Sequence, residues 1–121
     1  FVGGSHKWGK YFRPERFDKT PLNENDGLEE VPDINGNRDS FNVDGWAMEP
    51  GDAVAFNYKT LHGAPANNSA SEQRRAFSLR LLGDDARFAR REGVKTSPPF
   101  RGVTLAHGAV MDGPEFPVLV S

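Results

Sequence analysis

The sequence has 121 residues, which is enough for one small domain with a modest core. Its net charge of −2, from 15 basic and 17 acidic residues, excludes the basic footprint of a protein that binds nucleic acid or an anionic membrane. The absence of cysteine excludes disulfides and thiolate metal sites, and no apolar run approaches the roughly 20 residues of a membrane span. We therefore expect a cytoplasmic protein that binds neither nucleic acid nor membrane.

The first 40 residues favour loops over regular structure. Residues 1–20 mix aromatic and charged residues with two adjacent glycines, which indicates the end of a strand followed by a loop. Residues 21–40 are polar, acidic and rich in turn formers, so we expect an exposed excursion with a tight turn at Asn35-Gly36. The sequence begins at Phe1 and not at a methionine, which favours a fragment or a processed chain.

Three strands are predicted in the middle of the sequence. Residues 41–48 form the first and residues 53–61 the second, with the turn signal Pro50-Gly51-Asp52 between them. Residues 63–73 have the composition of a loop. Residues 74–82 alternate with period two and predict the third strand.

The third predicted strand has two distinct faces. One face carries Arg74, Ala76, Ser78, Arg80 and Leu82, and the other carries Arg75, Phe77, Leu79 and Leu81. An arginine on a polar inner face has the right chemistry for a dicarboxylate, because its fork is bidentate and permanently charged. A surface arginine at a strand edge is the alternative interpretation.

The last third of the sequence predicts one short helix and a tail. Gly83-Asp84-Asp85 opens a helix that runs to about Arg91, since aspartate suits a helix start, and Gly93 stops it. Residues 94–121 hold three prolines between Pro98 and Pro114 and predict an extended tail packed over the sheet.

His62 is the first candidate for metal chemistry. It stands at the end of the second predicted strand, and Gly63 beside it allows close approach of the backbone. Histidine in such a position is a sensible metal ligand. A lone histidine is more often a structural or surface residue, so spacing alone leaves both interpretations open.

Several stretches resemble the phytanoyl-CoA dioxygenase family. They are the opening FVGGSHKWG, the runs PGDAVAFNYKTLHGAPANNS and RRAFSLRLLGDDARF, and the closing SPPFRG and MDGPEFPVL, which resemble the tails of uncharacterised bacterial members. The resemblance implies a mainly β, double-stranded β-helix fold of the jelly-roll or cupin-like type. It also implies a non-haem dioxygenase that uses iron(II) and 2-oxoglutarate to hydroxylate a small organic substrate.

The resemblance assigns roles to individual residues. His62 matches the distal histidine that holds iron in the family, and Arg74, within Arg74-Arg75-Ala76, matches the arginine that binds 2-oxoglutarate. Ser78 and Arg80 share the face of Arg74, so we expect them to line the same cavity, and Arg75 is the second choice. His6, in the loop that resembles the family's, is expected to pin that loop and not to bind metal.

The sequence departs from the family pattern at the metal site. The residues two places after His6, His62 and His107 are Trp8, Ala64 and Ala109, so no histidine-any-carboxylate motif exists here. In the family this motif precedes the glycine–serine–histidine loop. We therefore expect residues 1–121 to be a single partial domain, the C-terminal half of the β-helix, which lacks the first half of the metal site and is inactive alone.

Two alternatives stay open. A non-catalytic half-barrel, or a cupin-like binding domain, would pair its exposed strands with another chain, as in a homo-oligomer that completes the barrel. A halogenase is the other, and the residues upstream would distinguish it from a hydroxylase.

Overall fold

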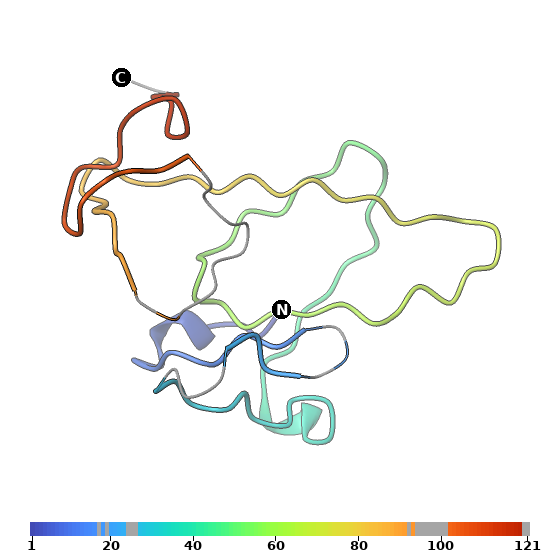
Figure 1. Cartoon of the computed structure of the whole chain (residues 1–121). Helices are drawn as coiled ribbons and strands as arrows, with labels where there is room; N and C mark the ends of the chain where they lie inside the picture. The colour runs from blue at the N-terminus through green and yellow to red at the C-terminus, as the bar shows by residue number, and fades with distance from the viewer. Residues whose placement is uncertain (17, 19, 24–26, 92, 94–101, 120–121) are drawn as a thin grey trace. The chain divides into compact units, whose positions relative to one another are not determined.

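The computed structural model describes residues 1–16, 18, 20–23, 27–91, 93 and 102–119. The chain divides into two compact units, Phe1–Glu72 and Gln73–Ser121, and each is described by itself. Figure 1 shows a largely irregular trace with short helical turns. These are the 3₁₀ helices η1, Ser5–Lys7, and η2, Arg38–Ser40. Within the described residues no helix has the length and apolar character needed to cross a membrane.

The first unit is organised around its opening residues. Val2 donates its backbone N–H to the carbonyl oxygen of Leu61 at 2.8 Å and forms an antiparallel bridge with Val43. Gly3 donates to the carbonyl oxygen of Asn42 at 2.7 Å. Val2 is 4% exposed, and among the described residues no other apolar side chain is buried to this degree. The opening segment therefore ties two later segments together around a very small core.

The turn expected at Pro50-Gly51-Asp52 is confirmed. Asp52 donates its backbone N–H to the carbonyl oxygen of Glu49 at 3.0 Å, and Gly51 has a φ of 105°. Proline in second place and a glycine with positive φ in third place are the requirements of a type II turn. The local sequence is sufficient to specify this turn.

The turn expected at Asn35-Gly36 is confirmed as well. A turn covers residues 34–37, and the N–H of Gly36 donates to the Asp33 carboxylate at 2.9 Å. Every described residue between 21 and 40 is exposed or half-buried, as an exposed excursion requires. Aspartate side chains close such turns through their own backbone neighbours.

The three predicted strands are wrong as regular elements of this structure. Within the described residues, strand-like pairing takes the form of isolated bridges, and the bridge formed by residues 41–48 is at Val43. Residues 53–61 and residues 74–82 form no bridge. A strand needs a neighbour whose N–H and C=O groups continue the ladder, and these segments lack one. The double-stranded β-helix and the single partial domain stay predictions.

The short helix predicted from Asp84 to about Arg91 is wrong. Phe88 donates its backbone N–H to the carbonyl oxygen of Ala109 at 2.8 Å and accepts from the N–H of Gly108 at 2.7 Å. Both backbone groups of Phe88 are thus engaged by a distant segment and are not available for helical bonds. Pairing across the second unit has overridden the local helix signal.

The tail expected at 94–121 is described only in part. Residues 94–101 and 120–121 lie outside the described residues. Residues 102–119 are irregular apart from turns and an antiparallel bridge between Val110 and Arg87. A tail packed over a sheet is not found, since the described residues form no sheet.

Candidate functional site

His62 lies in the first unit with one ring nitrogen engaged. Its Nδ1 lies 2.8 Å from the carbonyl oxygen of Thr60. A carbonyl oxygen can only accept, so Nδ1 carries the proton and the lone pair of the neutral ring is on Nε2. Metal-binding histidines commonly donate one ring N–H to a carbonyl in this way and bind metal through the other nitrogen. The local geometry of His62 therefore suits a ligand that uses Nε2.

Two phenylalanines hold the imidazole of His62 in place. The Phe1 ring stacks on it at 5.8 Å between centroids and 15° between planes. The Phe56 ring meets it at 4.7 Å and 58°, and the two phenyl rings meet each other edge-on at 4.9 Å. Trp46 extends this aromatic group by contact with Phe1 at 5.6 Å. The ring of His62 thus lies in an apolar, ordered setting although the residue as a whole is exposed.

The residue before His62 is held from two sides. Leu61 donates its backbone N–H to the Ser5 hydroxyl at 2.9 Å, and its carbonyl accepts from Val2 at 2.8 Å. The same hydroxyl donates to the carbonyl oxygen of Val2 at 2.8 Å. Ser5 is 2% exposed. The start of η1 and Val2 therefore fix the backbone that leads into His62.

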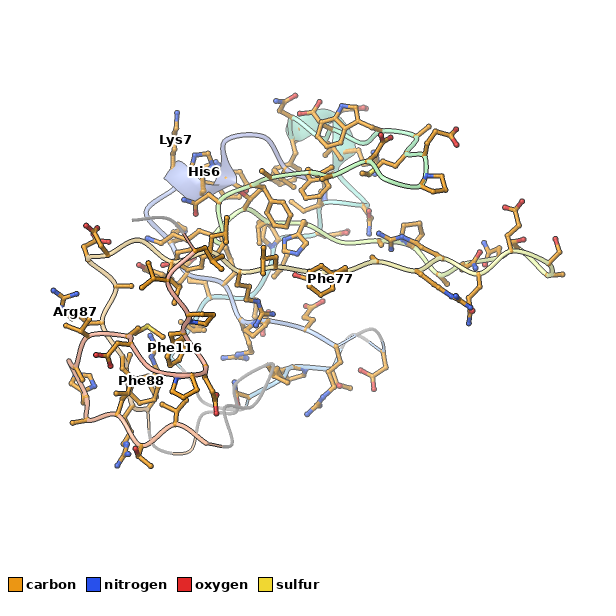
Figure 2. The ribbon with its side chains drawn as sticks, turned by 90° about the horizontal axis from the view of Figure 1, so that it is seen from above. His6, Lys7, Phe77, Arg87, Phe88 and Phe116 are labelled. Atoms are coloured by element: carbon orange, nitrogen blue, oxygen red, sulfur yellow. The ribbon has the colours of Figure 1, made fainter. Side chains whose placement is uncertain are left out.

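Ser5 is a residue that the sequence analysis missed. The GGSHK run drew attention to His6, which was expected to pin the loop. His6 has no hydrogen bond among the described residues, and Figure 2 shows its side chain with that of Lys7 on the η1 turn. The loop is pinned by Ser5 instead. A small hydroxyl residue directly after two glycines is the available signal, because it can be buried and still bond backbone groups.

The candidate co-substrate residues lie in the second unit. Arg74, Ser78 and Arg80 are all exposed on an extended segment, as is Phe77, which Figure 2 labels on the same stretch. Arg75, the second choice, donates to the Gln73 side-chain oxygen at 3.1 Å and 3.3 Å. Because the two units are described separately, no distance relates these residues to His62.

The donor set does not fit a complete iron centre. A non-haem iron(II) site of this class uses two histidines and one carboxylate on one face of the metal. Among the described residues, no three side chains of the histidine, aspartate or glutamate type gather closely enough to hold a metal ion. His62 is suited to be one ligand, and the described part of the chain does not supply the other two.

An open apolar hollow lies beside the aromatic group. It measures about 350 Å³ and is lined by Trp46, Ala47, Met48, Asp52, Ala53, Val54 and Ala55. Trp46 is shared between this hollow and the aromatic contacts of Phe1. Most of the lining side chains are apolar, which suits an apolar part of a small molecule, and Asp52 adds a carboxylate.

One titrating group near the site is perturbed. A hydrogen bond with the Tyr11 side chain raises the pKa of Lys59 above its usual value. The Lys59 ammonium also lies 4.4 Å from the centre of the Tyr11 ring, a cation–π distance. The contact favours the charged lysine and fixes a cation three residues before His62.

Comparison with known proteins gives one match. A family model described as Phytanoyl-CoA dioxygenase (PhyH) matches residues 1–76. This span includes His62 and Arg74 and ends before Ser78 and Arg80. No curated protein and no solved structure matches the chain.

Proposed function

This chain belongs to the phytanoyl-CoA dioxygenase family, and on that premise we propose that it is part of an iron(II)- and 2-oxoglutarate-dependent dioxygenase. In this proposal His62 is the distal iron ligand, and Arg74 binds the far carboxylate of 2-oxoglutarate, with Ser78 and Arg80 lining the same cavity. The histidine and carboxylate that complete the metal site come from outside this sequence. The fold we propose is the C-terminal part of a double-stranded β-helix.

One observation carries the proposal. The family match spans His62 and Arg74, and the Nδ1 of His62 is bonded to a carbonyl oxygen at 2.8 Å, which leaves the lone pair of the neutral ring on Nε2. Arg74 adds the permanent charge and bidentate geometry that a carboxylate requires. The apolar hollow beside Trp46 supports a small organic substrate with an apolar part.

The proposal is tested by anaerobic titration with iron(II) and 2-oxoglutarate, followed by the visible metal-to-ligand charge-transfer band of the chelate. The titration is made on this chain and on the protein encoded by the full reading frame that contains it. We expect a band at about one equivalent of iron in the full-frame protein and none in this chain, since no three ligand-type side chains gather among the described residues.

Variants of the full-frame protein assign the roles. His62→Ala is expected to abolish the band, Arg74→Ala to weaken 2-oxoglutarate binding by at least tenfold, and His6→Ala to change neither. A full-frame protein without a band would rule out the dioxygenase. A band that survives His62→Ala would place the ligand elsewhere.

A second candidate function is a non-catalytic domain that pairs with another chain. Phe77, Leu79 and Leu81 lie on one face of their segment and are 90%, 63% and 71% exposed, which favours burial against a partner. Sedimentation equilibrium distinguishes this case, because pairing would give a concentration-dependent mass that falls to the monomer mass in Phe77→Ser.

A further inference from the structure

Ser5 connects the start of the chain to the backbone in front of His62. Its hydroxyl accepts the N–H of Leu61 at 2.9 Å and donates to the carbonyl oxygen of Val2 at 2.8 Å. The carbonyl of Leu61 in turn accepts the N–H of Val2 at 2.8 Å. Leu61 is therefore bonded through both of its backbone groups immediately before the histidine.

We propose that Ser5 is a positioning residue for His62, which fixes Leu61 and so presents Nε2 of the imidazole to a ligand. The role as an iron ligand rests on the proposed function, whereas the orientation of the ring does not. The metal would be bound by His62 itself, and Ser5 would act only through the backbone.

The geometry explains why a hydroxyl is required at this position. Ser5 is 2% exposed, and a buried hydroxyl is tolerated only where its hydrogen bonds are made. Here it makes two, both to backbone groups. An alanine would fill nearly the same space but would leave the N–H of Leu61 without its acceptor.

The ring orientation depends on this backbone. The hydrogen bond from Nδ1 to the carbonyl oxygen of Thr60 joins residues two positions apart. It therefore forms only when the backbone from Thr60 to His62 keeps one conformation. The contacts of the ring with Phe1 and Phe56 require the same backbone conformation. When Leu61 is released, the backbone no longer keeps this conformation. The imidazole then returns to the Nε2–H form that histidine prefers in water.

The experiment measures the tautomer of His62 directly. Long-range ¹H–¹⁵N spectra of the chain with ¹⁵N-labelled histidine, recorded at about pH 8, distinguish a protonated from an unprotonated Nε2. His62→Asn identifies the signal. In the wild-type chain we expect the Nδ1–H form, in Ser5→Ala a shift toward the Nε2–H form, and in Ser5→Thr, which keeps the hydroxyl, the wild-type signal.

A matched control comes from the other 3₁₀ helix of the same unit. Ser40, the last residue of η2, is exposed, and Ser40→Ala is expected to leave the His62 signal unchanged. The proposal is wrong if the wild-type ring is in the Nε2–H form, or if Ser5→Ala keeps the wild-type tautomer. It is also wrong if Ser5→Ala loses amide dispersion throughout residues 10–40, because Ser5 would then be a general determinant of folding.

The outcome is independent of the iron titration. A normal charge-transfer band with an unchanged tautomer in Ser5→Ala would overturn the role of Ser5 and leave the dioxygenase in place. A tautomer shift in Ser5→Ala without any band in the full-frame protein would support the role of Ser5 and rule out the dioxygenase.

Discussion

At the scale of single residues, the sequence predicts a chemical role for His62 but not the contacts that hold its ring. His62 was a candidate from its place after a β-like run and from the family resemblance. The partners that orient its ring, Phe1 and Phe56, could not be predicted, because centroid contacts of 5.8 Å and 4.7 Å depend on tertiary packing. Ser5 was missed for the same reason, since its acceptor role depends on Leu61, 56 residues away.

Asp18 gives a prediction that belongs to the residue scale. The Thr20 hydroxyl donates to its carboxylate at 2.6 Å, and this bond is the largest cause that lowers the pKa of Asp18 below 3.8. Because the folded pKa is the lower one, the bond contributes stability above pH 3.8 and loses it as the pH falls through the folded pKa. Thr20→Ala should raise the pKa of Asp18 part of the way back.

The pKa of Asp18 should rise only part of the way in Thr20→Ala, because the backbone N–H of residue 20 still donates to Asp18 at 3.0 Å. Carboxyl ¹³C chemical shifts followed against pH give the pKa of Asp18 in the wild type and in Thr20→Ala. Thr104→Ala in the second unit is the control and should leave the titration of Asp18 unchanged. Identical titration curves for Thr20→Ala and the wild type would contradict the assigned cause.

At the scale of elements, local signals succeeded where a few neighbours are sufficient and failed where a distant partner decides. The turn at Pro50-Gly51 needs only its own residues, and it is present. The period-two pattern of residues 74–82 is real, but a pattern does not supply the second strand. The helix predicted after Asp84 does not form, because Phe88 pairs with Ala109 instead. Local sequence cannot predict this contact, since the two residues are far apart in the chain.

Gly4 gives a prediction for the η1 element. It caps η1 with a φ of 78°, and a Cβ built on it meets no atom within 4 Å. The cost of Gly4→Ala is therefore conformational and should lower the free energy of unfolding by about 1–2 kcal/mol. Urea unfolding followed by tryptophan fluorescence measures this difference.

Gly45 is the matched control, because an added Cβ there also meets nothing and its φ lies outside the left-handed region. Gly45→Ala should leave the free energy of unfolding unchanged or raise it by about 0.4–1 kcal/mol, since alanine restricts the unfolded chain. Equal losses in both variants would show that the left-handed φ of Gly4 is not the cause of the cost.

At the scale of the whole molecule, the sequence was informative about family and uninformative about assembly. The family resemblance rests on short motifs and is confirmed by the match to residues 1–76. The single partial domain stays a prediction, because the division of the chain into the compact units Phe1–Glu72 and Gln73–Ser121 does not test it. The burial of Val2 could not be foreseen either, since its backbone pairs with Val43 and Leu61, which are distant in the sequence.

The boundary between the units gives a prediction for limited proteolysis. All residues from 62 to 82 are exposed, and Glu72 ends the first unit within this stretch. A protease that cleaves after glutamate should therefore cut after Glu72 before it cuts after Glu29, whose side chain pairs with Lys10 at 2.7 Å and whose backbone bonds Tyr11 and Arg13. Mass spectrometry of the first fragments checks the order.

The Asn67 side chain, which donates to the carbonyl oxygen of Glu72 at 2.7 Å, modulates this cleavage. Asn67→Ala should accelerate cutting after Glu72 and leave the rate at Glu29 unchanged. Faster cleavage at Glu29 than at Glu72 in the wild-type chain would show that the exposed stretch is not the accessible boundary.

The bond between Ser5 and Leu61 also has a consequence for the order of events in folding. It closes a loop of 56 residues, and the N-terminal amine reaches the carbonyl of Asp44 across 43. Contacts of such high sequence separation carry a large closure entropy and slow the folding reaction. During synthesis the bond between Ser5 and Leu61 cannot form until Leu61 has left the ribosome, so Val2 and Ser5 stay without these partners while the residues between them and Leu61 are made.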